Sequence, residues 1–313
     1  IARLRDRATE IELSIHEQLL SSARVIACTL AGAANRILDN QHYHTLVVDE
    51  AAQALEAAVW IPLQKGDRLI LAGDHRQLPP TIKNPEAARA GLADTLMQVV
   101  AEEKPECVSM LKVQYRMNDD IARFSSKMFY DGQIVSAPEV KNRGILDFDT
   151  PVSWIDTSRT DFREEFVGES YGRINRAEAE LTVNSLKSYI EEIGKRRLLE
   201  ENIDIGVISP YKAQVQLLRR MFGRDAFFKP FRNLVTVNTV DGFQGQERDI
   251  IVISLVRANE EGNIGFLSDI RRMNVAITRA RMKLFILGNP DTLLHHPFYR
   301  KLYEYVKALE KDI

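Results

Sequence analysis

Two adjacent carboxylates follow a short apolar run early in the sequence. Residues 46–48 (Leu-Val-Val) predict a buried strand, and Asp49 and Glu50 come directly after it. The carboxyl end of a parallel strand is where α/β proteins bind their ligands. At that position Asp49 could bind Mg²⁺, and Glu50 could polarise a water for attack on a γ-phosphate. A strand that ends in Asp-Glu is also common without such a role, so the pair alone leaves both interpretations open.

A second polar segment follows the next apolar run of the chain. Residues 73–80 read Gly-Asp-His-Arg-Gln-Leu-Pro-Pro, directly after the strand expected at 69–72. A neutral amide such as that of Gln77 is suited to sensing a phosphate, and the two prolines would stiffen the exit of the loop. A plain turn would account for the glycine and the prolines, but not for polar residues one strand after Asp49.

Three later motifs carry groups that suit nucleotide chemistry. Residues 114–117 (Gln-Tyr-Arg-Met) offer an arginine for a phosphate and a tyrosine for a planar base. Residues 241–247 hold two glycines that let backbone approach a ligand, and Gln and Glu residues of the same motif could hydrogen-bond ribose or phosphate. Residues 271–281 are basic and helix-like, so Arg272 and Arg279 would share a cationic face. Taken singly, each motif also has a structural interpretation that stays open. These are a packed tyrosine beside a solvated arginine for 114–117, a glycine-containing hairpin for 241–247 and a solvated basic helix for 271–281.

The elements that would position these motifs alternate along the chain. Unalternating, partly β-branched runs predict strands buried on both faces, and amphipathic stretches predict helices between them, which together indicate α/β layering. Asn175 and Ser209 are natural N-caps, with Pro210 as a first helical residue. The expected strands are 25–28, 46–48, 69–72, 152–155, 205–208, 234–240, 250–256 and 283–287, the expected helices are 3–21, 51–60, 175–192 and 210–222, and the expected loops are 131–151 and 157–173.

The composition restricts the class of protein. The 313 residues include 42 Lys and Arg against 44 Asp and Glu, a net charge of −2 that excludes a uniformly basic coat but allows a local basic groove. Two cysteines cannot form a disulfide framework and, with six scattered histidines, predict no zinc site. No apolar run approaches the ~20 residues that span a bilayer. We therefore expect an intracellular protein, in cytoplasm or nucleus, without a membrane partner.

Taken together and in this order, the motifs resemble the C-terminal motor region of superfamily 1 DNA/RNA helicases. The resemblance is to the group that contains the nonsense-mediated-decay helicase, the immunoglobulin-mu-binding helicase and senataxin, and it extends from Val25 to Asn289. The similar segments are 47–53 for motif II, 73–80 for motif III, 114–117 for motif IV, 239–247 for motif V and 274–281 for motif VI.

The resemblance implies an α/β fold of two RecA-like P-loop NTPase domains with parallel sheets, the first incomplete. Residues 1–22 would be the helical tail of an inserted subdomain. Residues 23–112 would form the C-terminal part of the first RecA-like domain, and residues 113–313 the second. The implied activity is ATP-dependent movement in the 5′-to-3′ direction on single-stranded DNA or RNA. The sequence leaves the choice between DNA and RNA open.

The resemblance also implies roles for single residues. Asp49 would bind Mg²⁺, Glu50 would activate water, Gln77 would sense the γ-phosphate of ATP, and Arg116 and Arg279 would be arginine fingers. Tyr115 would contact adenine, with Gly245 and Glu247 near phosphate and ribose. The single strand would be held, through contacts with its backbone, by Thr29, Ser209, Tyr211, Lys212 and Thr239.

One family motif is missing from the sequence. No Gly-x-x-x-x-Gly-Lys-Ser/Thr occurs, and the Gly194-Lys195 pair is followed by Arg196. Because the chain also lacks an initiator Met, we expect a C-terminal fragment that hydrolyses ATP poorly or not at all by itself. Two alternatives stay open: a non-hydrolysing nucleic-acid-binding or interaction module derived from a helicase, and a P-loop NTPase that does not act on nucleic acid.

Overall fold

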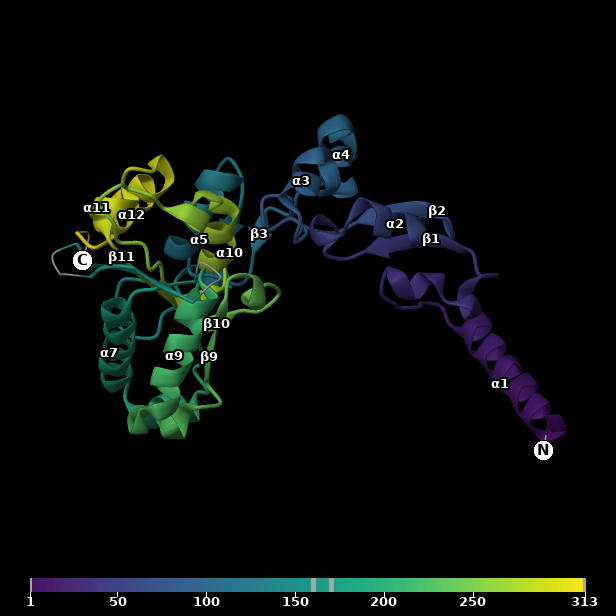
Figure 1. Cartoon of the computed structure of the whole chain (residues 1–313), viewed down its shortest axis with the longest axis horizontal. Coiled ribbons are helices and arrows are strands. Elements are labelled where there is room, and N and C mark those ends of the chain that lie inside the picture. Colours follow the sequence, from purple (N-terminus) through teal and green to yellow (C-terminus); the bar gives the residue numbers. More distant parts are fainter. Residues whose placement is uncertain (1, 159–161, 169–171, 312–313) are drawn as a thin grey trace. The chain divides into compact units, whose positions relative to one another are not determined.

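The chain divides into two compact units, residues 1–108 and 109–313, whereas the sequence indicated a division after residue 112 (Figure 1). The computed structural model describes residues 2–158, 162–168 and 172–311. Among the helices of these residues, none combines the length and apolar character that crossing a bilayer requires.

The first unit begins with the long helix α1 (Ala2–Ser22), which confirms the helix expected over 3–21. The strand expected at 25–28 is wrong: these residues have no strand partner, and Val25 is 85% exposed. Without a neighbouring strand to pair with, an apolar run of four residues gains little from being extended. Two short 3₁₀ turns follow it, η1 (Ala31–Ala34) and η2 (Arg36–Leu38).

The sheet of the first unit pairs β1 (Tyr43–Val48) with β2 (Gly66–Leu71) in parallel, with Val48 opposite Leu71. Both expected strands are confirmed. The expected helix 51–60 is instead split into η3 (Ala51–Gln53) and α2 (Glu56–Leu63), and the fully buried core between these elements is small. The unit continues with α3 (Pro85–Ala87), η4 (Ala88–Leu92), α4 (Leu96–Glu103) and η5 (Pro105–Cys107).

The second unit is built on a parallel sheet of five strands in the order β5-β11-β10-β8-β9. The apolar runs of the sequence predicted all five, and they are confirmed. Burial on both faces explains why these runs do not alternate with polar residues. The strands are β5 (Val152–Asp156), β8 (Ile205–Ser209), β9 (Val235–Thr239), β10 (Arg248–Ser254) and β11 (Ala280–Gly288).

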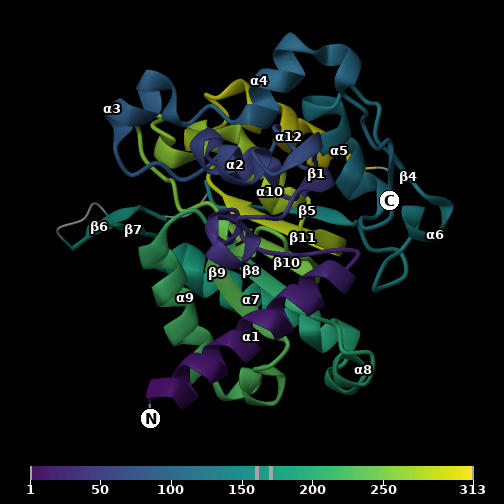
Figure 2. The ribbon, with the colours of Figure 1, turned by 90° about the vertical axis from the view of Figure 1, so that its right-hand side faces the viewer.

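Helices cover both faces of this sheet. Figure 2 shows α7 (Arg176–Ile193) and α9 (Lys212–Arg224) on one side of the strands, and α5 (Asp119–Phe129), α10 (Ile270–Ile277) and α12 (Pro297–Leu309) on the other. The main core lies between the strands and α7 with α9, and it includes the fully buried Leu218 and Leu287. The smaller helical pieces are α6 (Pro138–Lys141), α8 (Lys195–Glu200), η6 (Ala226–Phe231), η7 (Asp241–Phe243), η8 (Gly265–Ser268) and α11 (Pro290–Leu293).

The helix starts and loops of the second unit agree only in part with those predicted from the sequence. The side chain of Asn175 accepts from the backbone N–H of Glu178 at 3.0 Å, so the expected cap of α7 is confirmed. The helix expected from Pro210 begins at Lys212 instead, with Tyr211 as its N-cap. The loops expected at 131–151 and 157–173 contain short elements: β4 (Val135–Ser136) pairs with β3 (Val113–Gln114), and β6 (Glu165–Val167) pairs antiparallel with β7 (Gly172–Ile174). Residues 159–161 and 169–171 of the second expected loop lie outside the described residues.

Candidate nucleotide and nucleic-acid sites

The carboxylates of the first unit lie at the carboxyl end of β1. Asp49 Oδ1 accepts from the backbone N–H of Glu50 at 2.9 Å. Glu50 has a left-handed backbone (φ 51°), and its Oε2 accepts from Gln53 Nε2 at 2.6 Å. Both carboxylates are exposed, and each has one oxygen engaged locally. The arrangement therefore presents carboxylate oxygens to solvent at the edge where α/β proteins bind ligands.

The loop that follows β2 lies beside these carboxylates. The backbone N–H of Ala51 donates to Ala72 O at 2.8 Å, and Ala72 N–H donates to Val48 O at 2.9 Å. A Cβ on Gly73 would lie 3.0 Å from the backbone nitrogens of Ala51 and Ala52, so the two segments approach closely because residue 73 is glycine. The parallel pairing of β1 and β2 thus brings both predicted motifs of this unit together.

The side chain of Gln77 is oriented within its own loop. Its Nε2 donates to Asp74 Oδ2 at 2.8 Å, and its backbone N–H donates to Asp74 O at 3.1 Å. Asp74 Oδ1 accepts from the backbone N–H of Arg76 at 2.9 Å. Asp74 therefore organises the loop, a role that the sequence did not indicate.

In the second unit, Arg116 forms an ion pair with Glu247. Its Nε lies 2.5 Å from Glu247 Oε2, and its Nη1 donates to Thr278 O at 3.0 Å. The side chain of Gln114 fixes the turn by accepting from the backbone N–H groups of Arg116 and Met117 at 2.8 and 2.7 Å. About a third of the Arg116 side chain (34%) remains exposed, which leaves part of the side chain accessible to a ligand.

Glu247 also binds a second arginine. Its Oε1 accepts from Arg281 Nε at 3.0 Å, and Arg281 Nη1 donates to Asp249 Oδ1 at 2.9 Å. Partial burial on its own would raise the pKa of Glu247, but the hydrogen bond from Arg116 and the charges of Arg116 and Arg281 lower that pKa below its usual value. Glu247 therefore stays ionised and holds both arginines at the start of β10 and β11.

Arg279 is buried, contrary to the solvated basic face that the sequence allowed. Only 3% of the residue is exposed, and it lies beyond the end of α10, so it does not share a helical face with Arg272. Its guanidinium donates to Val275 O at 3.0 Å, to Gln246 O at 3.1 Å and to Thr278 Oγ1 at 3.1 Å. These bonds join the end of α10 to the loop that contains Glu247.

Two further predicted residues lie near this cluster in the sequence. Tyr115, next to Arg116, is 67% exposed, and its carbonyl accepts from Arg143 Nη2 at 2.9 Å. Gly245 has φ +74° with open space where a Cβ would stand, so glycine is favoured there by the backbone conformation alone. Both residues offer an accessible surface, one aromatic and one of bare backbone.

The residues of the second unit that were predicted to contact the nucleic acid lie at the carboxyl ends of its strands. Glu247 and Arg279 lie at the amino ends, on the opposite side of the sheet. Ser209 and Thr239 end β8 and β9 and are partners in the parallel ladder. Thr239 Oγ1 accepts from the backbone N–H of Gly242 at 3.3 Å. Lys212, at the start of α9, is exposed, whereas Ser209 and Tyr211 are buried. Pairing of the two strands thus places Thr239 beside the segment that carries Lys212.

Thr29, the predicted strand-contacting residue of the first unit, is exposed just before a 3₁₀ turn. Its Oγ1 accepts from the backbone N–H of Gly32 at 2.9 Å, a bond that is internal to this turn. Asp49 and Glu50, by contrast, follow β1, and the Gln77 loop follows β2. The pairing of these strands therefore gathers the carboxylates and the Gln77 loop, and Thr29 belongs to a separate turn.

Sequence reasoning missed several residues that organise the second unit. Arg281 lies within the basic segment 271–281, but its bonds to Glu247 and Asp249 follow from the pairing of β10 with β11, which no local pattern reveals. The spacing of Asn175 and Glu178 also predicted a capping box, and this is wrong for Glu178. Its Oε1 instead accepts from Ser254 Oγ at 2.6 Å and from the backbone N–H of Val256 at 2.8 Å, and the backbone N–H of Asn175 donates to Gln214 Oε1.

The donor set of the first unit suits Mg²⁺ bound together with phosphate oxygens. Within residues 2–158, 162–168 and 172–311, no group of three or more His, Cys, Asp and Glu side chains could hold a metal by itself. Mg²⁺ usually takes one or two protein carboxylates and fills its other positions with water and substrate phosphates. The exposed carboxylate of Asp49, with that of Glu50 beside it, fits that mode of binding.

Comparison with known proteins agrees with the geometry. Two families, each described as "AAA domain", match residues 92–291 and 1–85. An uncharacterized ATP-dependent helicase of Methanocaldococcus jannaschii is 36% identical over 328 residues, covering 100% of this chain and 46% of that protein. The DNA-binding protein SMUBP-2 of Rattus norvegicus is 36% identical over 319 residues, covering 97% of this chain and 31% of that protein.

A third relative, a regulator of nonsense transcripts 1 homolog of Neurospora crassa, is 36% identical over 312 residues, covering 96% of this chain and 27% of that protein. The chain therefore spans less than half the length of these relatives. These matches extend over nearly the whole chain and confirm the resemblance drawn from the motifs. The chain belongs to the superfamily 1 helicases with AAA domains, in the group of the nonsense-mediated-decay, immunoglobulin-mu-binding and senataxin-like helicases.

Proposed function

We propose that this chain is part of the motor of an ATP-dependent helicase or translocase that moves 5′-to-3′ on single-stranded nucleic acid. The observation that carries the proposal is the division of polar groups in the second unit. One group of residues lies at the amino ends of β10 and β11, namely Arg116, Arg279 and Glu247. A second group lies at the carboxyl ends of β8 and β9, namely Thr239 and the segment 209–212. The amino ends and the carboxyl ends of the strands could bind nucleotide and nucleic acid at the same time. A motor that couples ATP hydrolysis to movement along nucleic acid needs both sites.

In the first unit, Asp49 would bind Mg²⁺ and Glu50 would take a proton from the attacking water. When bound, the metal ion would neutralise charge on the phosphate oxygens. Glu50 has one oxygen held by Gln53, so its orientation is set while the other oxygen remains available. Gln77, held by Asp74, would report the γ-phosphate through its amide group.

In the second unit, Arg116 is the better placed of the two proposed arginine fingers. It keeps a third of its side chain exposed, whereas Arg279 is buried and already donates to three oxygens of its own unit. Arg116 would therefore contact the phosphates, and Arg279 would mainly hold the loop at Gln246. Tyr115 would stack on adenine, with Gly245 and Glu247 near phosphate and ribose.

For the nucleic acid, we propose direct contacts by the accessible residues Thr29, Lys212 and Thr239. Ser209 and Tyr211 are buried, so their role would be to position the turn before α9 rather than to touch the strand. Contacts of this kind grip phosphates without reading sequence. The relatives named as a DNA-binding protein and as a regulator of nonsense transcripts leave both DNA and RNA as candidate substrates.

The test is ATP hydrolysis by the whole protein that carries this chain, measured with single-stranded DNA and with single-stranded RNA. Glu50→Gln removes the proposed base and keeps the size of the side chain, so turnover should fall about 10²- to 10⁴-fold with nucleic-acid affinity unchanged. Glu86→Gln, an exposed residue of the same unit, is the matched control and should hydrolyse ATP normally.

The arginines are tested in the same assay. Arg116→Gln should lower turnover by about 10³-fold or more, the range seen for arginine fingers. Arg123→Gln, a surface arginine on α5, is its control. Normal turnover in Glu50→Gln and Arg116→Gln would refute the proposed motor, and strand binding without any hydrolysis in the parent would favour the non-hydrolysing module.

A further inference from the structure

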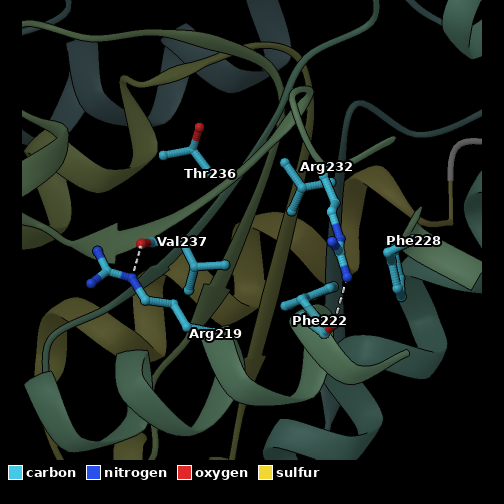
Figure 3. Close-up of a pocket in the computed structure, with 8 residues that line it drawn as sticks. Arg219, Phe222, Phe228, Arg232, Thr236 and Val237 are labelled. Carbon is cyan, nitrogen blue, oxygen red and sulfur yellow. Dashed lines mark hydrogen bonds between the residues drawn. The ribbon is translucent and has the colours of Figure 1, made fainter. Parts of the chain in front are cut away.

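A pocket of about 370 Å³ lies at the outer side of β9, and none of the proposed nucleotide or nucleic-acid residues lines it. It is bounded by the last turns of α9, by η6 and the residues after it, and by the first residues of β9 (Figure 3). Its lining combines arginine, phenylalanine and valine side chains, namely Arg219, Phe222, Phe228, Arg232, Val235 and Val237.

The wall formed by β9 is an open strand edge. β9 is the last strand of the five-stranded sheet, and the N–H of Ile205 in β8 donates to Leu234 O at 2.8 Å. Because backbone groups alternate in direction along a parallel ladder, those of Val235 and Val237 point outward. The Nε of Arg219 donates to Val237 O at 2.9 Å, which agrees with that direction. An unpaired edge of this kind is a template for another strand.

The pocket is cationic with an apolar floor. Arg232 Nη2 donates to Gly223 O at 2.9 Å, so both arginines are fixed by one backbone bond and keep further N–H groups (Figure 3). Neither arginine has an ion-pair partner among the described residues, and no acidic residue lines the pocket. Phe222 and Phe228 pack edge to face, with ring centroids 4.7 Å apart, and both are buried.

We propose that this pocket binds an extended acidic segment of a partner protein, which adds to the sheet as a strand beside β9. The backbone of the segment would bond to the outward groups of Val235 and to the N–H of Val237. One apolar side chain would lie against Phe222 and Phe228, and carboxylates would pair with Arg219 and Arg232. Backbone pairing gives such complexes affinity, and the pockets give them specificity.

A peptide fits this pocket better than a nucleic acid does. Phe222 and Phe228 line the pocket but are only 6% and 1% exposed, too little for a base to stack on a ring face, whereas an aliphatic side chain needs only a small contact. The proposed nucleic-acid residue of β9, Thr239, ends the strand, whereas the pocket takes residues 235–237 nearer its start. The outward N–H and C=O groups of β9 can form hydrogen bonds with the backbone of an extended peptide. The phosphates of a nucleic acid could contact only the two arginines.

The probe is an array of random octapeptides, incubated with the fluorescently labelled 313-residue chain. The strongest peptides should be enriched in Asp and Glu around an apolar residue. Binding of the strongest one is then measured in solution by fluorescence anisotropy. The double variant Arg219→Gln with Arg232→Gln should weaken it about tenfold or more, since each charge-assisted pair is lost. The matched control Arg196→Gln with Arg300→Gln makes the same change of net charge elsewhere.

Strand addition is tested by N-methylation of the peptide, which leaves the protein intact. Methylating one alternate set of residues should abolish binding, and methylating the other set should preserve it, because only one set faces β9. Equal effects of the two sets would overturn strand addition. Absence of any enriched acidic peptide, or unchanged affinity in the double arginine variant, would overturn the proposal. A third result would also overturn it: no peptide binds, but the double arginine variant loses affinity for a labelled single-stranded oligonucleotide. The pocket would then be part of the nucleic-acid site.

Discussion

The two units have parallel strands in common but differ in how much of them is buried. The first unit pairs β1 with β2, and its fully buried apolar cluster consists of Val48, Ala51 and Val59. The second unit aligns five strands between two layers of helices, and its core contains many fully buried side chains from strands, α7 and α9. All buried charged residues of the described chain also lie in the second unit.

This difference extends to the proposed site residues. In the first unit, the side chains of Glu50 and Gln77 bond to Gln53 and Asp74, three residues away in sequence. In the second unit, Arg116 bonds to Glu247 and Thr278, which are more than a hundred residues away. A bond between residues close in sequence is lost when their loop unfolds locally. An ion pair between distant segments is kept as long as the sheet that joins these segments is folded. We therefore expect the second unit to be the more stable and the more rigid site.

The largest expected effect comes from matched leucines in the two sheets. Leu287→Ala empties a fully buried position in β11 and should lower the free energy of unfolding of the second unit by about 2–5 kcal/mol. Leu71→Ala, in β2, removes a partly exposed side chain and should cost the first unit about 1 kcal/mol. The two tryptophans allow each unit to be followed separately in urea, with Trp60→Phe leaving Trp154 of the second unit and Trp154→Phe leaving Trp60 of the first. Similar losses from both leucine variants would contradict the comparison.

A smaller effect should appear as a dependence on pH that is confined to the second unit. Burial raises the pKa of Glu178 to about 7, although hydrogen bonds from Ser254 and from the backbone of Val256 lower it in part. The carboxyl is therefore protonated in the folded state at pH values where the unfolded chain has already lost the proton. Stability from this group is greatest below about pH 4.5, falls as the pH rises through 7, and is then constant, with a total loss of up to about 3 kcal/mol.

The measurement compares wild type with Glu178→Gln by urea unfolding, followed through Trp154, between pH 5 and 8. Glutamine keeps the acceptor for Ser254 and does not titrate, so wild type should lose stability relative to this variant as the pH rises. Glu201→Gln changes an exposed glutamate paired with Arg197 and serves as the control. A constant difference between wild type and Glu178→Gln over this range would mean that the buried carboxyl does not titrate there.

The smallest expected effect concerns the bonds that hold each site. Glu247→Gln removes the charge that binds Arg116 and Arg281 and should lower the free energy of unfolding of the second unit by about 1 kcal/mol, since all three side chains are partly exposed and screened. Gln53→Ala removes the bond to Glu50 in the first unit and should cost about 0.5 kcal/mol or less, because both residues are near the surface. If the order of these two losses were reversed, the second site would not be the more rigid one.

Prediction from sequence succeeded where one local pattern was enough. The apolar runs of β8, β10 and β11 indicated buried parallel strands, because a strand covered on both faces needs apolar residues at every position. Asn175 indicated the start of α7 for an equally local reason, since its side chain caps an N–H three residues on. The run at 25–28 is also apolar and partly β-branched but has no strand partner in the first unit, so the same pattern failed there.

Prediction of the site was less complete, because burial and pairing depend on segments far apart in the chain. The basic segment 271–281 indicated cations correctly, but not that Arg279 is buried against Gln246 or that Arg281 bonds to Asp249. The proposed roles of the site residues rest on the resemblance and stay predictions.

The sequence by itself determined the α/β class, the positions of most strands and the membership of a helicase family, since periodicity and ordered motifs are properties of the chain. The tertiary structure decided which polar groups meet, namely that Arg116 and Glu247 lie before the strands while Thr239 lies after them. It also decided that β9 is an open edge beside Arg219 and Arg232. The physical reason is that strand order fixes these neighbours, and strand order is a long-range choice that no single segment encodes.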